Sequence, residues 1–275
     1  MGNSLISKIS SDAVRKLKAI FNNPYSSFGI TWPQVKKLRN SSSGSTHQMF
    51  LFGKPFYFGS GNEVLHALDE IFIDEYYKID FGTDSPYIID CGAHIGMSVL
   101  YCKQQYPESK IIAFEPDSGN YELLSKNIAS FEYKDVDLRK EAVWIENTIL
   151  NFAGTGSMSS RIEENANNYS TSVKAIRLND ILVEKVNFLK LDIEGAEYKV
   201  IIDIHEKLHL IEYLFIEYHG SFLQNSELNE ILQIVTEAGY KYYIKEAAES
   251  YHTPFSRKGQ KPDYDLQLNI FCFRN

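Results

Sequence analysis

The chain has 275 residues, a formal net charge of -8 and 44% apolar residues. This length fits one α/β domain with an appendage or two small domains, and the apolar content excludes a disordered chain. The acidic balance and the absence of a long basic run disfavour a nucleic-acid partner. No apolar run reaches the ~18 residues that a membrane span requires. Three cysteines at unpaired spacing indicate a reducing compartment, so we expect a cytoplasmic protein without a membrane span.

The first part of the chain predicts an N-terminal extension made of helices and a β-hairpin. Two aromatic-rich runs, 48–52 and 55–58, flank a Gly-Lys pair and predict the hairpin. Residues 63–77 carry apolar side chains at helical spacing. We therefore predict that residues 1–84 form an extension packed on a main domain over residues 85–275. The extension is also a candidate contact for a homodimer.

From residue 85, short apolar runs alternate with segments of helical periodicity. Apolar runs without polar alternation are typical of strands buried on both faces, and their alternation with helices favours a doubly wound, mostly parallel α/β sheet. The expected strands are 87–90, 110–115, 136–144, 187–192, 213–218, 240–244 and 266–273, and the expected helices are 96–105, 118–130, 196–205 and 226–238.

The turn after the first of these strands predicts a ligand site. Asp90 ends the strand, and Gly92 and Gly96 follow before a helix begins, so the backbone can turn tightly and a ligand can approach the helix N-terminus. The spacing Asp-x-Gly-x-x-x-Gly differs from the dinucleotide pattern Gly-x-Gly-x-x-Gly. Asp90 would repel a pyrophosphate and suits a ligand with cationic amino and sulfonium groups. Glu115, at the end of the second strand, can accept both hydroxyls of a ribose.

Four ordered blocks resemble the FkbM family of S-adenosylmethionine-dependent methyltransferases. They are IDCGAHIGMSVLY (89–101), IAFEPD (112–117), FLKLDIEGAE (188–197) and IEYHG (216–220). The resemblance runs from about Tyr87 to Tyr240, and His94 stands where the family usually has Asn. It implies a Rossmann-like class I methyltransferase fold, with a mostly parallel doubly wound sheet and an antiparallel last strand. It also implies O-methylation of a hydroxyl on a sugar, glycan or related small molecule.

The resemblance assigns cofactor contacts to residues at the ends of the first three strands. Two of these assigned residues, Asn120 and Glu141, also have a simpler interpretation. Asn120 can be a polar group in the first turn of a helix, and Glu141 a solvated loop carboxylate. The turn residues hold the methionine part, the second strand end holds the ribose, and Glu141 and Ala142 lie near the adenine. The full set is Asp90, Gly92, Ala93, His94, Gly96, Glu115, Pro116, Asn120, Glu141 and Ala142.

A second group of polar residues follows the fourth and fifth strands. Lys190 and Asp192 are two residues apart on a strand, so they share a face, and a buried lysine needs a partner. That pair is either an ion pair that fixes the strand end or part of the site, with Lys190 and Glu194 as substrate contacts. Because the ends of neighbouring parallel strands meet, Asp192, Glu217 and His219 are expected to lie together as catalytic residues.

A sugar hydroxyl must lose its proton when it attacks a methyl group. We predict that His219 takes this proton, with Asp192 or Glu217 orienting the imidazole. The alternative is that Asp192 and Glu217 hold a divalent cation that acidifies the hydroxyl. Two other functions compete with methyl transfer: a nicotinamide-dependent oxidoreductase, and a module that binds S-adenosylmethionine without turnover.

Overall fold

The computed structural model describes residues 23–41, 44–153, 161–162, 171–257, 259–260 and 262–274. The chain divides into two compact units, with the boundary between Lys78 and Ile79. The boundary predicted from the sequence falls a few residues later, after residue 84. Residues 1–22 of the predicted extension lie outside the described residues, and the extension's role stays a prediction.

The first unit contains the predicted hairpin, in which β1 and β2 pair antiparallel from His47↔Phe58 to Leu51↔Lys54. Its aromatic side chains pack among themselves: the Phe28 ring lies 5.5 Å from that of Phe52 and 5.6 Å from that of Phe72. The single helix predicted over 63–77 is instead an α-helix that passes into a π-helical segment. The elements are η1 (Ser26–Phe28), α2 (Trp32–Arg39), β1 (His47–Leu51), β2 (Lys54–Phe58), α3 (Gly61–Ala67) and η2 (Leu68–Ile73).

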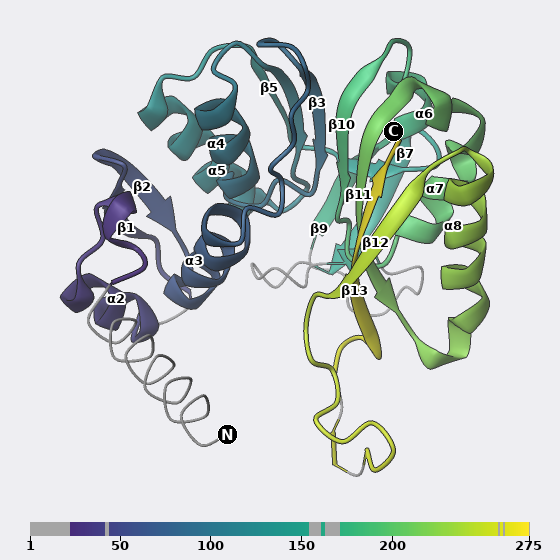
Figure 1. Ribbon diagram of the computed structural model, residues 1–275. Helices are drawn as coiled ribbons and strands as arrows, with labels where there is room; N and C mark the ends of the chain where they lie inside the picture. The colour runs from purple at the N-terminus through teal and green to yellow at the C-terminus, as the bar shows by residue number, and fades with distance from the viewer. Residues whose placement is uncertain are drawn as a thin grey trace, which may run out of the picture. The chain divides into compact units, whose positions relative to one another are not determined.

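The second unit is built on a seven-stranded sheet with the order β12-β13-β11-β10-β3-β4-β5 (Figure 1). The five strands from β11 to β5 are parallel, whereas β13 pairs antiparallel with both β11 and β12. The predicted class I methyltransferase sheet with an antiparallel last strand is therefore confirmed. Its strands are β3 (Tyr87–Cys91), β4 (Lys110–Phe114), β5 (Val136–Arg139), β10 (Val186–Leu191), β11 (Ile211–Gly220), β12 (Lys241–Glu246) and β13 (Leu266–Phe273).

The prediction of one strand over 136–144 is wrong. Lys140 and Glu141 interrupt the run, and the part beyond them, β6 (Ala142–Trp144), belongs to a separate four-stranded sheet. There β6 pairs in parallel with β9, so hydrogen bonds from a segment some thirty residues away decide where it lies. The other strands of this sheet are β7 (Thr148–Ala153), β8 (Arg161–Ile162) and β9 (Thr171–Arg177).

Helices flank the strands of the large sheet, as its connections require. Among the described residues, α4 and α5 follow β3 and β4, while α7 and α8 follow β10 and β11 and pack on each other. Their bounds are α4 (Met97–Gln105), α5 (Ser118–Phe131), α6 (Leu178–Ile181), α7 (Glu197–Asp203), η3 (His205–Leu210), η4 (Phe222–Gln224) and α8 (Asn225–Glu237). No helix within the described ranges has the length and apolar character needed to cross a membrane.

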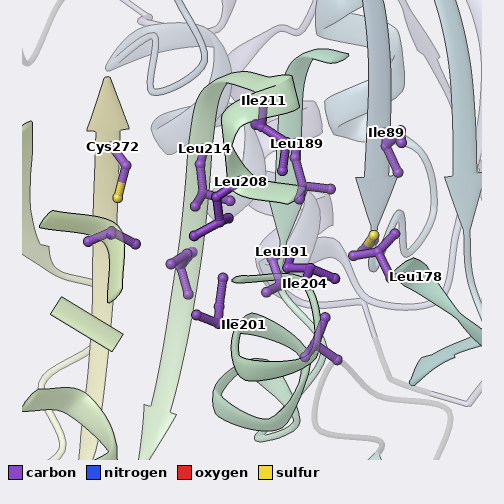
Figure 2. Packing of buried hydrophobic residues seen from close by; sticks show 14 of the residues in the cluster. Ile89, Leu178, Leu189, Leu191, Ile201, Ile204, Leu208, Ile211, Leu214 and Cys272 are labelled. Atoms are coloured by element: carbon purple, nitrogen blue, oxygen red, sulfur yellow. The ribbon is translucent and has the colours of Figure 1, made fainter. Parts of the chain in front are cut away.

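Alternate residues of the central strands face opposite layers, as the two-residue period of a strand dictates. Ile89 of β3 and Leu191 of β10 belong to the same buried cluster as Ile201 and Ile204, which come from α7 and its end (Figure 2). Each fully buried leucine or isoleucine contributes about 1.5–3 kcal/mol to stability. This layer fixes the positions of β3 and β10 relative to each other.

The intervening residues of β3 and β10 face α4, and two of them are charged. Asp90 and Lys190 line an interior space together with Ser98 and Cys102 of α4. The chain winds outward from β3 in one direction and from β10 in the other, so these two strands flank the switch point of the sheet. In open α/β sheets, ligands bind at the carboxyl ends of the strands at this point.

Candidate functional site

The glycine turn after β3 is held against both neighbouring strands. The backbone amides of Gly92 and Ala93 donate to the carbonyl of Phe114, at 3.0 and 2.9 Å. Gly92 has φ +93°, and a Cβ there would lie 1.8 Å from the carbonyl oxygen of Asp192. Only glycine fits this position, because its backbone passes so close to the end of β10. The turn is thus fixed in the conformation that presents the α4 N-terminus to a ligand.

Asp90 and Lys190 form a buried ionic group directly beneath the turn. The Lys190 ammonium lies 3.4 Å from Asp90 Oδ1, and it donates to the Gly92 carbonyl at 2.8 Å and to Asp192 Oδ2 at 2.9 Å. The Ser98 hydroxyl donates to the other oxygen of Asp90. Lys190 therefore ties the two strand ends to the turn. Its predicted role as a substrate contact stays a prediction.

Glu115 closes the turn from the side of β4. Its two carboxylate oxygens accept from the backbone amides of His94, at 2.8 Å, and Asp117, at 2.9 Å. Burial raises the pKa of Glu115 to about 8, although these two hydrogen bonds act in the opposite direction. Each carboxylate oxygen has a second lone pair, so Glu115 retains the capacity to accept ribose hydroxyls.

The backbone of His94 accounts for its departure from the family pattern. His94 has φ +47°, in the left-handed region that few residues other than glycine adopt. Asn, Asp and His are several-fold enriched there, so His preserves a turn in which the family usually places Asn. Burial lowers the pKa of the His94 imidazole to about 4, and the ring is therefore neutral near pH 7.

The remaining residues assigned to the cofactor follow β4 and β5 in the chain, near the first turn of α5 and the start of β6. Asn120 is buried in the first turn of α5, and its backbone amide donates to Asp117 Oδ1 at 2.9 Å. Glu141 forms an ion pair with Lys174 of β9. Ala142 is buried in β6, and Pro116 is half-buried after β4. Their contacts with an adenosine stay predictions.

The ends of β10 and β11 bring together an imidazole and several carboxylates. Ligand atoms of Asp192, Glu194 and His219 all lie within 4.8 Å of one another. The Nε2 atom of His219 lies 3.7 Å from Glu194 Oε2 and 3.7 Å from Glu217 Oε1. Its Nδ1 atom lies 3.2 Å from Glu197 Oε1. The three predicted catalytic residues therefore lie in one neighbourhood, with Glu194 and Glu197 added to them.

Comparison of the sequence with models of known protein families identifies the family of this chain. Residues 90–242, more than half of the chain, match the methyltransferase FkbM domain. The chain belongs to the FkbM methyltransferase family. The matched range starts at Asp90 of the glycine turn and includes Glu115 and His219, so the resemblance seen in the sequence is confirmed. Membership makes this a S-adenosylmethionine-dependent methyltransferase domain, and the nicotinamide-dependent alternative is not supported.

Two proteins related in sequence carry methyltransferase names. Methyltransferase sdnD of Sordaria araneosa is 29% identical over 55% of this chain and 73% of its own length. Methyltransferase 1 of Beauveria bassiana is also 29% identical, over 50% of this chain and 66% of its own length. A crystal structure of methyltransferase FkbM from Methylobacillus flagellatus is 17% identical with a TM-score of 0.48, and the alignment covers 74% of this chain and 47% of that one.

The glycine turn of this FkbM methyltransferase fits the cofactor that its family implies. Among the described residues no hydrogen bond reaches Asp90 Oδ1, although this oxygen is buried. Its charged neighbour is the Lys190 ammonium at 3.4 Å, and it retains lone pairs that suit a cationic amino group.

The carboxylates around His219 shift its pKa away from the value of a free histidine. Burial lowers the pKa of His219, but the adjacent Glu197, with Glu194 and Asp192, outweighs it and raises the pKa to about 10. Burial raises the pKa of Glu194 to about 8, opposed by His219. The neighbouring carboxylates therefore favour the protonated form of the His219 imidazole. Its predicted role as a base requires that this proton first be lost or replaced.

Two residues of this group were not predicted from the sequence. Glu197 is only 1% exposed, and it accepts from the amides of Ile193 at 3.0 Å and Gly195 at 3.1 Å, in addition to its contact with His219. Its place in a first helical turn favoured a capping role. The Tyr264 hydroxyl donates to the Glu194 carbonyl at 2.9 Å, and its ring lies 4.7 Å from that of His219. No local pattern marks Tyr264, because it precedes β13 in an irregular segment.

Proposed function

We propose that this chain transfers a methyl group from S-adenosylmethionine to a hydroxyl of a sugar, glycan or related small molecule. The observation that supports this proposal is the cluster of Asp192, Glu194 and His219, whose ligand atoms lie within 4.8 Å of one another. The cluster adjoins the glycine turn, because the Asp192 amide donates to the Cys91 carbonyl at 3.0 Å. An acceptor held there would meet the methyl donor at the switch point of the sheet.

Placement is the main contribution of the protein to this reaction. When bound, S-adenosylmethionine supplies an electrophilic methyl group, so the protein has to align the acceptor oxygen with it. Asp90 and the glycine turn hold the amino acid end of the cofactor, and Glu115 holds the ribose. Both contacts are proposals that follow from the family's motifs.

The hydroxyl proton leaves to the carboxylate and imidazole group at the ends of β10 and β11. A lone pair of the hydroxyl oxygen would form the new bond to the methyl carbon as the methyl–sulfur bond breaks, and the electron pair of that bond would stay on sulfur in S-adenosylhomocysteine. The hydroxyl proton would pass to a side chain. Asp192 or Glu217 accepts it while His219 carries its own proton, and His219 accepts it where its Nε2 is deprotonated. In both cases the side chain acts as a general base. General base catalysis typically raises the reaction rate about 10²–10⁴-fold.

An exposed aromatic ring beyond β11, Phe222, and the half-buried ring of Tyr251 support an acceptor with a ring. The rings of Phe222 and Tyr251 stack with a centroid separation of 5.7 Å and an interplanar angle of 15°. The Arg257 guanidinium lies 4.6 Å from the centroid of the Phe222 ring. Aromatic faces of this kind stack on sugar rings. These residues are proposed to contact the acceptor outside the reacting group.

The proposal is tested by a methyl-transfer screen against nucleotide sugars and glycan oligomers, read by mass spectrometry. We expect a methylated product that His219→Gln and Asp192→Asn variants form about 10²–10⁴-fold more slowly, with affinity for S-adenosylhomocysteine retained. A Glu249→Gln variant, changed at an exposed side chain, serves as the matched control. Binding of S-adenosylhomocysteine without any product across the panel would instead favour a module that binds the cofactor without turnover.

A further inference from the structure

We propose that Asp192, Glu194 and Nε2 of His219 form a three-ligand site for a divalent cation of the Mn²⁺ or Zn²⁺ class. The inference rests on the proposed function only for the use of the cation, because its binding is a property of this group alone. The cation pair considered from the sequence was Asp192 with Glu217. Among the residues that the structure describes, the set within 4.8 Å contains Glu194 in place of Glu217.

The ligand types and spacing fit such an ion. Carboxylate oxygens and imidazole nitrogen bind Zn²⁺ at about 2.0–2.2 Å, so atoms sharing one ion lie at most about 4.4 Å apart. The Glu194 Oε2 to His219 Nε2 distance of 3.7 Å already meets this limit. The widest separation permitted within the set, 4.8 Å, requires a contraction of a few tenths of an ångström. One nitrogen and two oxygens suit Mn²⁺ or Zn²⁺ better than Mg²⁺, which prefers oxygen alone.

The imidazole is oriented as a metal-binding histidine is oriented in known sites. Its Nδ1 atom is engaged by Glu197 at 3.2 Å, which leaves Nε2 on the side of Glu194, 3.7 Å from its Oε2 atom. The His219 side chain is 4% exposed, and Glu197 is itself fixed by the amides of Ile193 and Gly195. A carboxylate that holds the second nitrogen of a ligating histidine sets its tautomer and raises its basicity.

The carboxylates of the group retain acceptor capacity for an ion. Lys190 occupies Asp192 Oδ2 at 2.9 Å, so the other oxygen of Asp192 remains available for the ion. Tyr264 donates to the backbone carbonyl of Glu194 at 2.9 Å and also contacts its carboxylate, whose Oε2 atom lies 3.7 Å from His219 Nε2. Glu197 adds a further negative charge behind the imidazole. A divalent cation balances this excess of carboxylates.

Three protein ligands leave coordination positions open, as in catalytic rather than structural metal sites. A hydroxyl that takes one of these positions is acidified by the ion, and its oxygen is held in place for attack on the methyl group. The proton then passes to a carboxylate such as Glu217, which lies 3.7 Å from Nε2.

The test is a titration of the chelator-treated full chain with Mn²⁺, followed by electron paramagnetic resonance and calorimetry in the absence of cofactor. We expect one saturable site per chain. Glu197→Gln should weaken it about 10–100-fold, and Glu194→Gln and Asp192→Asn at least as much. His252→Asn is the matched control, because His252 also lies 3.0 Å from a glutamate oxygen but is 88% exposed. It should leave the affinity unchanged.

Affinity for S-adenosylhomocysteine shows that each variant remains folded, and Zn²⁺ replaces Mn²⁺ in a second series. Absence of saturable binding of either ion, or binding that Glu194→Gln and Asp192→Asn leave intact, overturns the inference. Full methyl transfer after exhaustive chelation overturns the catalytic use of the ion and leaves the proposed function standing. Tight ion binding without methyl transfer to any hydroxyl acceptor would overturn the proposed function and leave the cation site standing.

Discussion

Replacement of Gly92 by alanine tests whether the turn depends on the contact between β3 and β10. The new Cβ would lie 1.8 Å from the Asp192 carbonyl oxygen, about 1.6 Å closer than the 3.4 Å at which ordinary contact begins. The left-handed φ of +93° adds about 1–2 kcal/mol for any residue with a Cβ. Overpacking adds about 1–3 kcal/mol, so we expect a loss of about 2–5 kcal/mol in the free energy of unfolding.

Urea unfolding measures this loss, and calorimetry with S-adenosylhomocysteine measures its consequence for the site. Because the turn must move away from Asp192, we expect affinity to fall at least about tenfold, equivalent to 1.4 kcal/mol. Gly239→Ala is the matched control: Gly239 has φ +85° and its Cβ would meet nothing within 4 Å, so only the conformational cost applies. Equal destabilisation in the two variants, or unchanged affinity in Gly92→Ala, would refute the reasoning.

Three further predictions concern charges and hydrogen bonds beneath the same turn. Burial raises the pKa of Glu115 to about 8, and ribose hydroxyls favour its carboxylate, so binding of S-adenosylhomocysteine at pH 7 should release up to about 0.9 proton. Affinity for S-adenosylhomocysteine should then rise with pH up to about 8. The proton release is measured calorimetrically in buffers of different ionisation enthalpy, and Glu115→Gln should abolish it. An unchanged proton release in this variant would assign the proton to another group. Lys190→Met leaves the carboxylates of Asp90 and Asp192 without their shared ammonium, and urea unfolding should show a loss of about 3–5 kcal/mol at pH 7 that diminishes in acid; wild-type stability would contradict the ionic role. Asn127→Ala removes the 2.8 Å hydrogen bond that the Asn127 side chain donates to the Ile95 carbonyl, between Gly92 and Gly96. The free energy of unfolding, measured by heat or urea, should fall by about 1–3 kcal/mol. An unchanged free energy of unfolding would show that water replaces the amide.

The local part of the fold and of the cofactor turn was readable from the sequence. The strand ending at Asp90, the glycines after it and Glu115 at the next strand end are encoded by neighbours along the chain, and the structure brings them together. Strands β3, β10, β11 and β13 were predicted because apolar runs of that length bury themselves wherever they lie. The assignment to the FkbM family followed from four such local blocks, and the family match confirmed it.

Only the tertiary structure decided which distant segments come into contact. Val136 to Trp144 looks continuous in the sequence, but pairing of Ala142 with Ala175 draws β6 into another sheet. Glu197 carries the same helix-start signal whether it caps its own amides or also holds His219. Nothing local distinguishes these outcomes, because they depend on contacts between residues that lie far apart in the sequence. By itself the sequence determined the strand ends and the cofactor turn, whereas packing of β10 against β3 and β11 decided which charges meet there and how they titrate.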